Sequence, residues 1–412
     1  MSHALLSMKF PPFDADLAAN FERLVFTPCN QLTYRSDLSN KATVTIAESS
    51  QWIRTHQALL TFELVPYTND AGGLEVEAKN CKSSRQGATR AIAEMNLLIG
   101  GKTVESVNPY DDVLAHELST VPEDQASGLT IMQGFEDPDF FKNGRRKVFL
   151  PIWSGLFLLA QALCLPMLSN GGIQLEIVWR GADNLFLNGT VKRFRVEGLG
   201  LLWQAISPNP STTGSLVAST KGGRPGNLTT QRLHVFQSSG NSLMHQQIIA
   251  TLRPKRSIVS VDVWAYDEAE YVENSKDKYL RFKPFGLRKW RIESGPNIRV
   301  PAVGDITHGD SDPSTVVTML MSQSSSVHNM FSGMKLREDW IHQHFRLSMD
   351  FQSHRELFGS GLNLLSASHP YLTIFTEHNA PVSPNTRLVC VVVTDELLTF
   401  ANDQVLVTET AF

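Results

Sequence analysis

The chain has few cysteines and little charge. Only four of its 412 residues are cysteines, and charged residues make up 19% of it. Cys29, Cys81, Cys164 and Cys390 form no Cys-x-x-Cys pair, and their spacing fits no zinc-binding pattern. Cys164 and Cys390 lie in apolar runs, which predicts buried thiols. The cysteines therefore do not indicate a disulfide framework, and a reducing compartment is expected.

The sequence also lacks a long basic block. It has 37 Lys and Arg against 41 Asp and Glu, for a net charge of −4, and its densest basic cluster is Arg145–Lys147. Neutralising phosphates requires clustered cations, so sequence-specific nucleic-acid binding is not expected. A secretory signal is not predicted, because Pro11, Pro12 and the acidic residues that follow would interrupt its apolar segment.

No catalytic constellation is found. There is no Gly-x-Ser-x-Gly, and Gly100–Thr103 resembles only the end of a phosphate loop, because the first glycine of that motif is missing. The acid pairs Asp111–Asp112 and Glu123–Asp124 lie in loop or helix-start contexts, where acids are ordinary. His308–Asp312 has oxygen ligands at alternate positions but not the rest of a calcium loop. We therefore predict no catalytic residue and no cofactor.

Two histidines are the candidate for a metal site. His342 and His344 would lie on one face of a strand, as the metal ligands of cupins do. A cupin needs a glutamate a few residues later, where Ser348 and Met349 stand instead. A hydrogen-bonded or solvent-facing pair is the favoured interpretation, so no metal is predicted.

A long uncharged run, Val148–Leu168, is the most conspicuous stretch that is present. About 20 apolar residues are enough to cross a bilayer, so a membrane-active protein is one hypothesis. Pro151 and Pro166 argue against a span, because each removes a backbone donor that lipid cannot replace. The turn signal Ser169–Gly172 follows, and then Ile173–Trp179 alternates in the manner of a half-buried strand.

The run is therefore interpreted as elements of a β-sandwich. We predict a strand over Lys147–Ile152, a short buried helix or loop over Gly155–Leu163, and a strand over Ile173–Trp179. Gly100 and Gly101 predict a hairpin within Leu97–Val107.

Strand patterns recur along the rest of the chain, and helices are few. Two helices are predicted by their caps, over Pro109–Leu118 and Asp312–Met321, and a third over Asp16–Leu24. The further predicted strands are Ala42–Ala47, Ala58–Tyr67, Leu74–Ala78, Val191–Ile206, Gln231–Gln237, Ser257–Tyr266, Tyr279–Phe285, Lys289–Glu293, His344–Phe351, Tyr371–Thr376, Arg387–Thr394 and Val405–Thr408.

A change of composition divides these strands into two sets. Residues 207–230 are rich in Gly, Pro and hydroxyl residues, which is typical of a linker or an exposed loop. We therefore predict an N-terminal arm over 1–28, a first domain over 29–206 and a second over 231–412. The fold class is all-β, with two tandem antiparallel sandwiches and short inserted helices.

Two blocks of the sequence resemble a known family. A strand into Leu150–Trp153, an apolar connection, Cys164–Leu168 and an alternating strand resemble the first jelly roll of the double jelly-roll major capsid proteins of DNA viruses. Ile152–Gly155 departs from the further aromatics that the family more often has, and the connection is compressed. In the second half, Phe345–Phe351 followed by the turn residues Ser360, Gly361, Asn363 and Ser366 is similar to the second jelly roll.

The resemblance covers about 200 to 240 residues in two blocks and implies a structural function. It implies two eight-stranded jelly rolls, homotrimers that form pseudo-hexagonal capsomers, an icosahedral shell, and a location in the virion after assembly inside the host cell. The partners it implies are neighbouring capsomers and the penton and minor capsid proteins. The alternative is a cupin-like or carbohydrate-active β-sandwich enzyme that uses a metal at His342 and His344.

Overall fold

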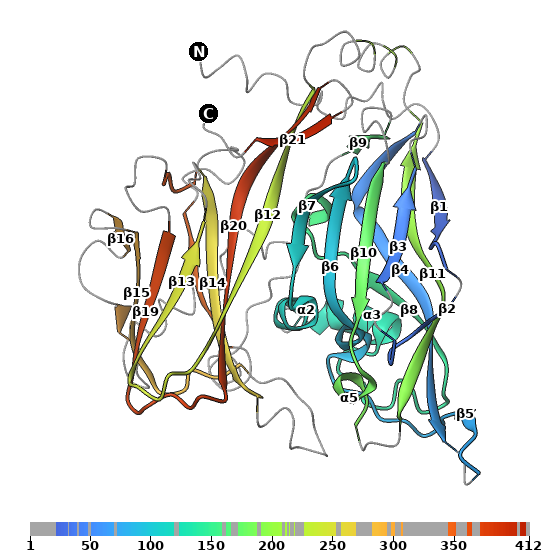
Figure 1. Ribbon diagram of the computed structural model, residues 1–412, viewed down its shortest axis with the longest axis horizontal. Coiled ribbons are helices and arrows are strands. Elements are labelled where there is room, and N and C mark those ends of the chain that lie inside the picture. The colour runs from blue at the N-terminus through green and yellow to red at the C-terminus, as the bar shows by residue number, and fades with distance from the viewer. Residues whose placement is uncertain are drawn as a thin grey trace. The chain divides into compact units, whose positions relative to one another are not determined.

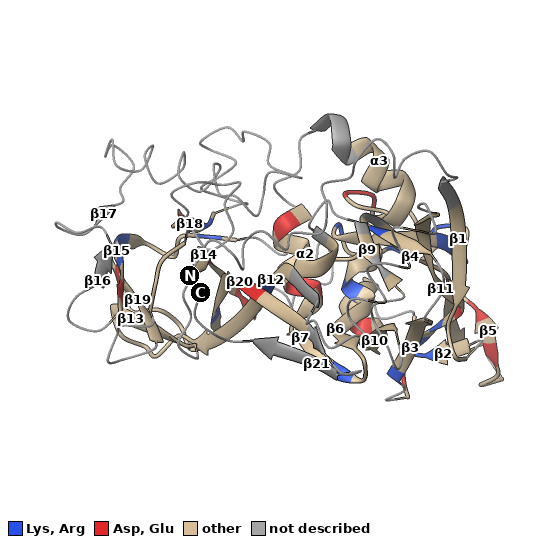
Figure 2. Cartoon of the chain, turned by 90° about the horizontal axis from the view of Figure 1, so that it is seen from above, with Lys and Arg blue, Asp and Glu red and all other residues tan. Residues whose placement is uncertain are grey.

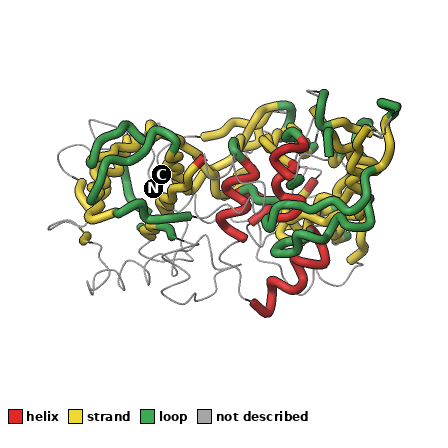
Figure 3. The backbone as a smooth tube through the Cα atoms, turned by 90° about the horizontal axis from the view of Figure 1, so that it is seen from below, coloured by secondary structure: helices red, strands yellow, loops and turns green. Residues whose placement is uncertain are grey.

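The computed structural model describes most of the chain. The residues it describes are 22–31, 33–38, 41–47, 51–69, 72–118, 123–158, 162–165, 172–187, 191–207, 211, 214, 218, 226–252, 257–268, 282–294, 298–300, 306–307, 345–351, 361–364, 371–401 and 404–408. Strands make up most of these residues, and the helices are few and short (Figure 3). No helix within these ranges is long and apolar enough to span a membrane.

The chain divides into two compact units. The first comprises Met1–Leu114, Ser127–Arg232 and Glu396–Thr408. The second comprises Ala115–Ala126, Leu233–Asp395 and Glu409–Phe412. Each unit is therefore considered by itself.

The first unit contains one large antiparallel sheet. Its central path runs in the order β1-β11-β4-β5, with β2 pairing β11 and with β8 and β9 pairing β4 (Figure 1). These strands are β1 (Glu22–Pro28), β2 (Thr33–Arg35), β4 (Trp52–Asn69), β5 (Glu75–Glu77), β8 (Arg146–Pro151), β9 (Ala162–Cys164) and β11 (Arg193–Ile206).

A second, four-stranded antiparallel sheet completes this unit. Its order is β3-β10-β6-β7, and the strands are β3 (Lys41–Ile46), β6 (Ile92–Ile99), β7 (Lys102–Val107) and β10 (Ile173–Trp179). Ile173, Leu175 and Ile177 are buried while the residues between them are half-exposed, as the alternation predicts. The chain crosses between the two sheets repeatedly, from β3 to β4, from β5 to β6 and from β10 to β11, as it does in a jelly roll.

The second unit repeats this arrangement. One antiparallel sheet has the order β12-β20-β14-β18, and the other has the order β13-β19-β15-β16, with β17 on β15. The end of β20, Leu397–Ala401, pairs with β21, and both of these stretches belong to the first unit. The strands are β12 (Gly226–Ser239), β13 (His245–Thr251), β14 (Ile258–Asp267), β15 (Leu287–Ser294), β16 (Ile298–Val300), β17 (Ile306–Thr307), β18 (Leu347–Asp350), β19 (Tyr371–His378), β20 (Thr386–Ala401) and β21 (Gln404–Thr408).

An apolar core lies between the two sheets of the second unit. Val261 and Val263 of β14 meet Trp290 of β15 and Ile374 of β19 in one buried cluster. Cys390 belongs to the same cluster, and burial raises the pKa of its thiol. The prediction of a buried thiol at Cys390 is therefore confirmed.

Short helices are inserted between the strands. They are the 3-10 helix η1 (Gly87–Ala91) and the α-helices α2 (Tyr110–Leu118), α3 (Glu123–Gln133), α4 (Gly155–Leu158) and α5 (Ala182–Leu185). The prediction of a helix over Pro109–Leu118 is confirmed to within one residue. The hairpin at Gly100 and Gly101 is also confirmed, because both have positive φ and join β6 to β7.

Several local predictions were wrong or incomplete. The strand predicted over Tyr279–Phe285 is not formed in its described part, because residues 282–285 belong to no strand. The helix predicted over Asp16–Leu24 is wrong at its end, because β1 begins at Glu22 and pairs with β11. The helix over Gly155–Leu163 ends at Leu158, and Ala162 begins β9 on β4. Strand β13 was not predicted, because two glutamines open it. The helix Asp312–Met321 and most of the linker 207–230 lie outside the described residues, although Gly226 already begins β12.

Gly172 closes the predicted turn in a conformation that disfavours a side chain. Its φ is +61°, and a Cβ there would lie 1.9 Å from the carbonyl oxygen of Ile46. We expect Gly172→Ala to lower the free energy of unfolding of the whole chain by about 1–3 kcal/mol. Urea denaturation followed by tryptophan fluorescence measures this change.

The matched control is Gly128→Ala in α3, where a Cβ meets no atom within 4 Å. That substitution should leave stability unchanged or raise it by up to about 1 kcal/mol. Equal stability of the two variants would contradict the packing argument for Gly172.

Candidate functional site

A neutral charge cluster is buried in the first unit. Asp111 and Asp112 begin α2, and both are at most 4% exposed. Arg90 of η1 contacts both carboxylates, at 3.2 Å for Asp111, and is itself 2% exposed. Arg180 adds two hydrogen bonds of 3.0 Å to Asp111. The acid pair predicted as an ordinary helix start is thus an ion cluster, which sequence spacing alone does not reveal.

The opposite charges of this cluster compensate one another and join its segments. Burial raises the pKa of Asp111 to about 6, Arg90 opposes the rise, and Asp112 adds to it. Two guanidinium groups balance two carboxylates, and together they tie η1, α2 and the residue after β10 to one another. The cluster therefore holds the inserted helix in place.

A second buried carboxylate fixes the start of α4. Glu105 of β7 is 2% exposed and accepts a hydrogen bond from the Ser154 hydroxyl. The backbone N–H of Gly155 also donates to it, at 3.0 Å. Charge-assisted bonds to a helix start compensate the desolvation of the carboxylate, so Glu105 also has a structural role.

The turn after β18 is held in a similar way. Gly361 donates its backbone N–H to Ser257 Oγ at 3.1 Å, and Ser257 donates in turn to the buried Asp395 at 2.5 Å. Leu362 and Ile258 exchange two backbone hydrogen bonds of 3.0 Å. The described part of the Ser-Gly-x-x-Asn turn, Gly361 to Asn363, thus docks on the start of β14, whereas Ser360 and Ser366 lie outside the described residues.

The structure describes only some of the residues considered as possible metal ligands. His342, His344 and the loop His308–Asp312 lie outside the described residues. Within the ranges that the structure describes, no three His, Cys, Asp or Glu side chains are placed to hold a metal. Gly100–Thr103 is a hairpin turn and not a phosphate loop.

A groove crosses the outer side of the first unit's large sheet. Its volume is about 480 Å³, and Phe26, Thr61, Phe149 and Leu202 line it. The strand register places Phe26 beside Leu202 and Thr61 beside Phe149. We call this side of the sheet, with Leu24, the Phe26 surface. Leu24 is 67% exposed and Phe26 is 49% exposed.

Charged residues form the rim of this groove. Glu63, Glu197 and Lys147 line it, and Arg145 lies close by with ion-pair distances of 3.2 Å to Glu77, 3.5 Å to Glu63 and 4.0 Å to Glu197. Burial alone would raise the pKa of Glu77, but hydrogen bonds from Arg145 lower it below its usual range. Two carboxylates, Glu63 and Glu197, and one cation, Lys147, therefore line this groove.

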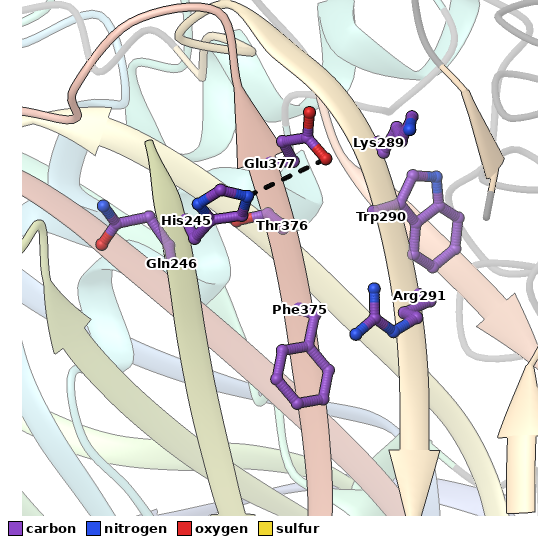
Figure 4. Close-up of a pocket in the computed structure, with 8 residues that line it drawn as sticks. All are labelled: His245, Gln246, Lys289, Trp290, Arg291, Phe375, Thr376 and Glu377. Atoms are coloured by element: carbon purple, nitrogen blue, oxygen red, sulfur yellow. Dashed lines mark ion pairs between the residues drawn. The ribbon is translucent and has the colours of Figure 1, made fainter. Parts of the chain in front are cut away.

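A second groove, of about 230 Å³, lies on the β13-β19-β15 sheet of the second unit (Figure 4). Arg291 of β15 places its guanidinium 4.5 Å from the centre of the Phe375 ring and bonds Glu293 at 2.6 Å. His245 and Glu377 point toward each other across neighbouring strands, 4.0 Å apart. With the 53% exposed Ile249 on β13, this side is called the Arg291 surface.

Cations are in excess on the Arg291 surface. Arg288, Lys289 and Arg291 are permanent cations, and Glu293 and Glu377 are the carboxylates beside them. The charged residues of β15 and β19 are coloured in Figure 2. Neither groove brings together a nucleophile, a base and an orienting group, so both have the character of contact surfaces.

The comparisons identify the fold. No protein-family model and no curated protein sequence matches the chain. Among solved structures, the Faustovirus major capsid protein aligns with 95% of this chain and 92% of its own, with a TM-score of 0.64 and 8% identity. The PBCV-1 virus capsid aligns with 95% and 98%, with a TM-score of 0.61 and 10% identity.

A third structure, that of the Sputnik virophage, gives a TM-score of 0.60 at 10% identity over 95% of this chain and 89% of its own. At such identities the likeness concerns the fold, which is the double jelly roll of viral major capsid proteins. The fold class predicted from the sequence is therefore confirmed.

The buried cluster allows a direct test of its role. We expect Arg90→Met to lower the free energy of unfolding by about 3 kcal/mol at pH 7, because two buried carboxylates lose a shared partner. The deficit should shrink toward pH 5. The pKa of Asp111 already lies above its unfolded value, so the neutral acid favours the folded state and this contribution is lost as pH rises.

Urea titrations at both pH values measure the effect. Arg387→Met, which removes a 37% exposed partner of Glu268 outside both grooves described above, is the control and should cost less than about 1 kcal/mol at either pH. A deficit of Arg90→Met that is the same at pH 5 and pH 7 would contradict the role assigned to the cluster.

Proposed function

We propose that this protein is the major capsid protein of a DNA virus, and that it assembles as a homotrimer with six jelly rolls into pseudo-hexagonal capsomers of an icosahedral shell. One observation carries the proposal. Three virus capsid structures align with 95% of the chain at TM-scores of 0.60 to 0.64, a share too large to come from one jelly roll alone.

The physical character of the described residues supports a structural function. The buried carboxylates Asp111, Glu105 and Asp395 hold chain segments in place, and none of them opens into a groove with a nucleophile. The outer sides of two sheets instead present aromatic and aliphatic side chains beside charges, which is the composition of protein interfaces. No feature of the described residues favours the metal-dependent enzyme.

The further partners follow from this function. The protein is located in the virion capsid, assembled inside the host cell, and its partners are neighbouring capsomers with penton and minor capsid proteins. These roles use protein surfaces and no cofactor, and the net charge of −4 is consistent with the absence of sequence-specific nucleic-acid binding.

Measuring the mass of the purified full-length chain tests the proposal. We expect light scattering after size exclusion to give three times the chain mass of 45.8 kDa at micromolar concentration. Negative-stain images of the same peak should show a particle with a pseudo-hexagonal outline, because six similar sandwiches surround one axis. A monomer that persists at about 50 μM, a range where stable interfaces are saturated, would overturn the proposal.

A further inference from the structure

We propose that the Phe26 surface of one copy packs against the Arg291 surface of the next copy, so that a heterologous sheet-on-sheet contact closes the trimer. The inference rests on the proposed function, which requires a trimer but does not say which surfaces meet. The occupant of each groove is therefore a second copy of this chain.

The first argument is exposed apolar area on the outer sides of two sheets. Jelly-roll sheets bury one side and ordinarily present polar residues on the other. Here Leu24 and Phe26 are 67% and 49% exposed on the first unit, and Ile249 is 53% exposed on the second. Each surface also has an aromatic ring in its groove, Phe149 on one and Phe375 on the other. Such residues favour burial against a partner.

The backbone of the first unit accommodates this exposed ring. Phe26 lies over Gly200, where a Cβ would be 2.4 Å from the ring. The ring is thus held flat on the sheet beside Leu202. Thr61 lies at the bottom of the same groove, 5% exposed, and its hydroxyl has no hydrogen-bond partner among the described residues. A polar group on the arriving surface would satisfy it.

The second argument is charge. The groove of the Phe26 surface is lined by two carboxylates, Glu63 and Glu197, and by one cation, Lys147. The groove of the Arg291 surface has the opposite excess, because two cations, Lys289 and Arg291, and one carboxylate, Glu377, line it. The ion pairs of Arg145 with Glu77 and of Arg193 and Arg195 with Glu75 are outside the lining of the first groove.

Two copies of either surface would therefore bring like charges together, whereas one of each brings opposite charges together. A contact between two different surfaces is heterologous, and a heterologous contact generates a ring when its rotation closes. Two sheets that pack side on side interdigitate at about 10 Å, a spacing that buries Phe26 and Ile249. The two surfaces together thus provide a self-limiting trimer contact.

The test uses two variants of the full chain that each damage one surface. Phe26→Asp places a charge on the Phe26 surface, and Ile249→Asp places one on the Arg291 surface. We expect each to raise the dissociation constant of the trimer by roughly 30-fold or more, because each removes a central apolar contact and buries a charge. Light scattering over a dilution series measures this, and Leu24→Asp is a second variant that leaves Phe26 packed on Gly200.

Mixing the two variants gives the decisive result. Phe26→Asp keeps an intact Arg291 surface and Ile249→Asp keeps an intact Phe26 surface, so an equimolar mixture should form a heterodimer that cannot grow into a ring. Cross-linking followed by mass spectrometry, with one variant carrying a tag, detects that species. The matched control is Ile131→Asp on α3, which changes a 79% exposed isoleucine outside both surfaces and should leave the trimer intact.

Three results would overturn the assignment of the two surfaces while leaving the proposed function in place. They are a trimer that both Phe26→Asp and Ile249→Asp still form as the wild type does, a mixture of these variants without heterodimer, or dissociation of the Ile131→Asp control. A monomeric wild type would instead refute the proposed function. Circular dichroism of each variant separates unfolding from dissociation. If Phe26→Asp unfolds, Leu24→Asp takes its place in the mixture and the same outcomes apply.

Discussion

Burial of one side of each sheet against its partner sheet is the interaction on which the rest of the molecule depends. Antiparallel strands place alternate side chains on opposite sides, so a strand with period-two apolar residues can fill a core on one side only. Ile173, Leu175 and Ile177 do this in the first unit, and Ile248, Ile292 and Ile374 in the second. The two sandwiches are stable because these side chains exclude water together.

Three buried carboxylates join segments that the packing of the two sheets does not itself order. Burial removes the water that would otherwise hydrate Asp111 and Glu105. Fixed protein donors replace its hydrogen bonds: arginines for Asp111, and Ser154 and Gly155 for Glu105. Asp395 does the same for the turn at Gly361 through Ser257. In all three cases an inserted helix or a turn is tied to a strand, so a charge pair replaces the apolar contact that a short insertion cannot provide.

The residues on the outer sides of the sheets are not constrained by packing of the core. The core requires nothing of Phe26, Phe149, Arg291 or Phe375, since each lies on the side that faces away from it. Half-exposed aromatic rings with charged neighbours in these positions are costly for an isolated domain, because they leave apolar area in water. In the proposed trimer, burial between copies removes that cost, and the opposite charge excess of the two grooves favours a contact between unlike surfaces.

The sequence by itself determined the elements whose pattern is local. The strand Ile173–Trp179, the hairpin at Gly100 and Gly101, and the helix before Leu118 follow from alternation, positive-φ glycines and helix caps. It also determined the fold class, because recurring strands with turn signals, two family-like blocks and few helices point to tandem sandwiches. Strand β13 was not predicted from the sequence, because His245, Gln246 and Gln247 have low strand propensity. Its pairing with β19 determines its structure instead.

Tertiary structure alone decided which distant residues meet. Nothing in the spacing of Arg90, Asp111 and Arg180 shows that they form one neutral cluster, since the chain must close two sheets before they approach. The same holds for Glu22–Leu24, where pairing with β11 overrides a helical composition. Register and long-range pairing set these contacts, and both depend on strands that lie more than a hundred residues apart.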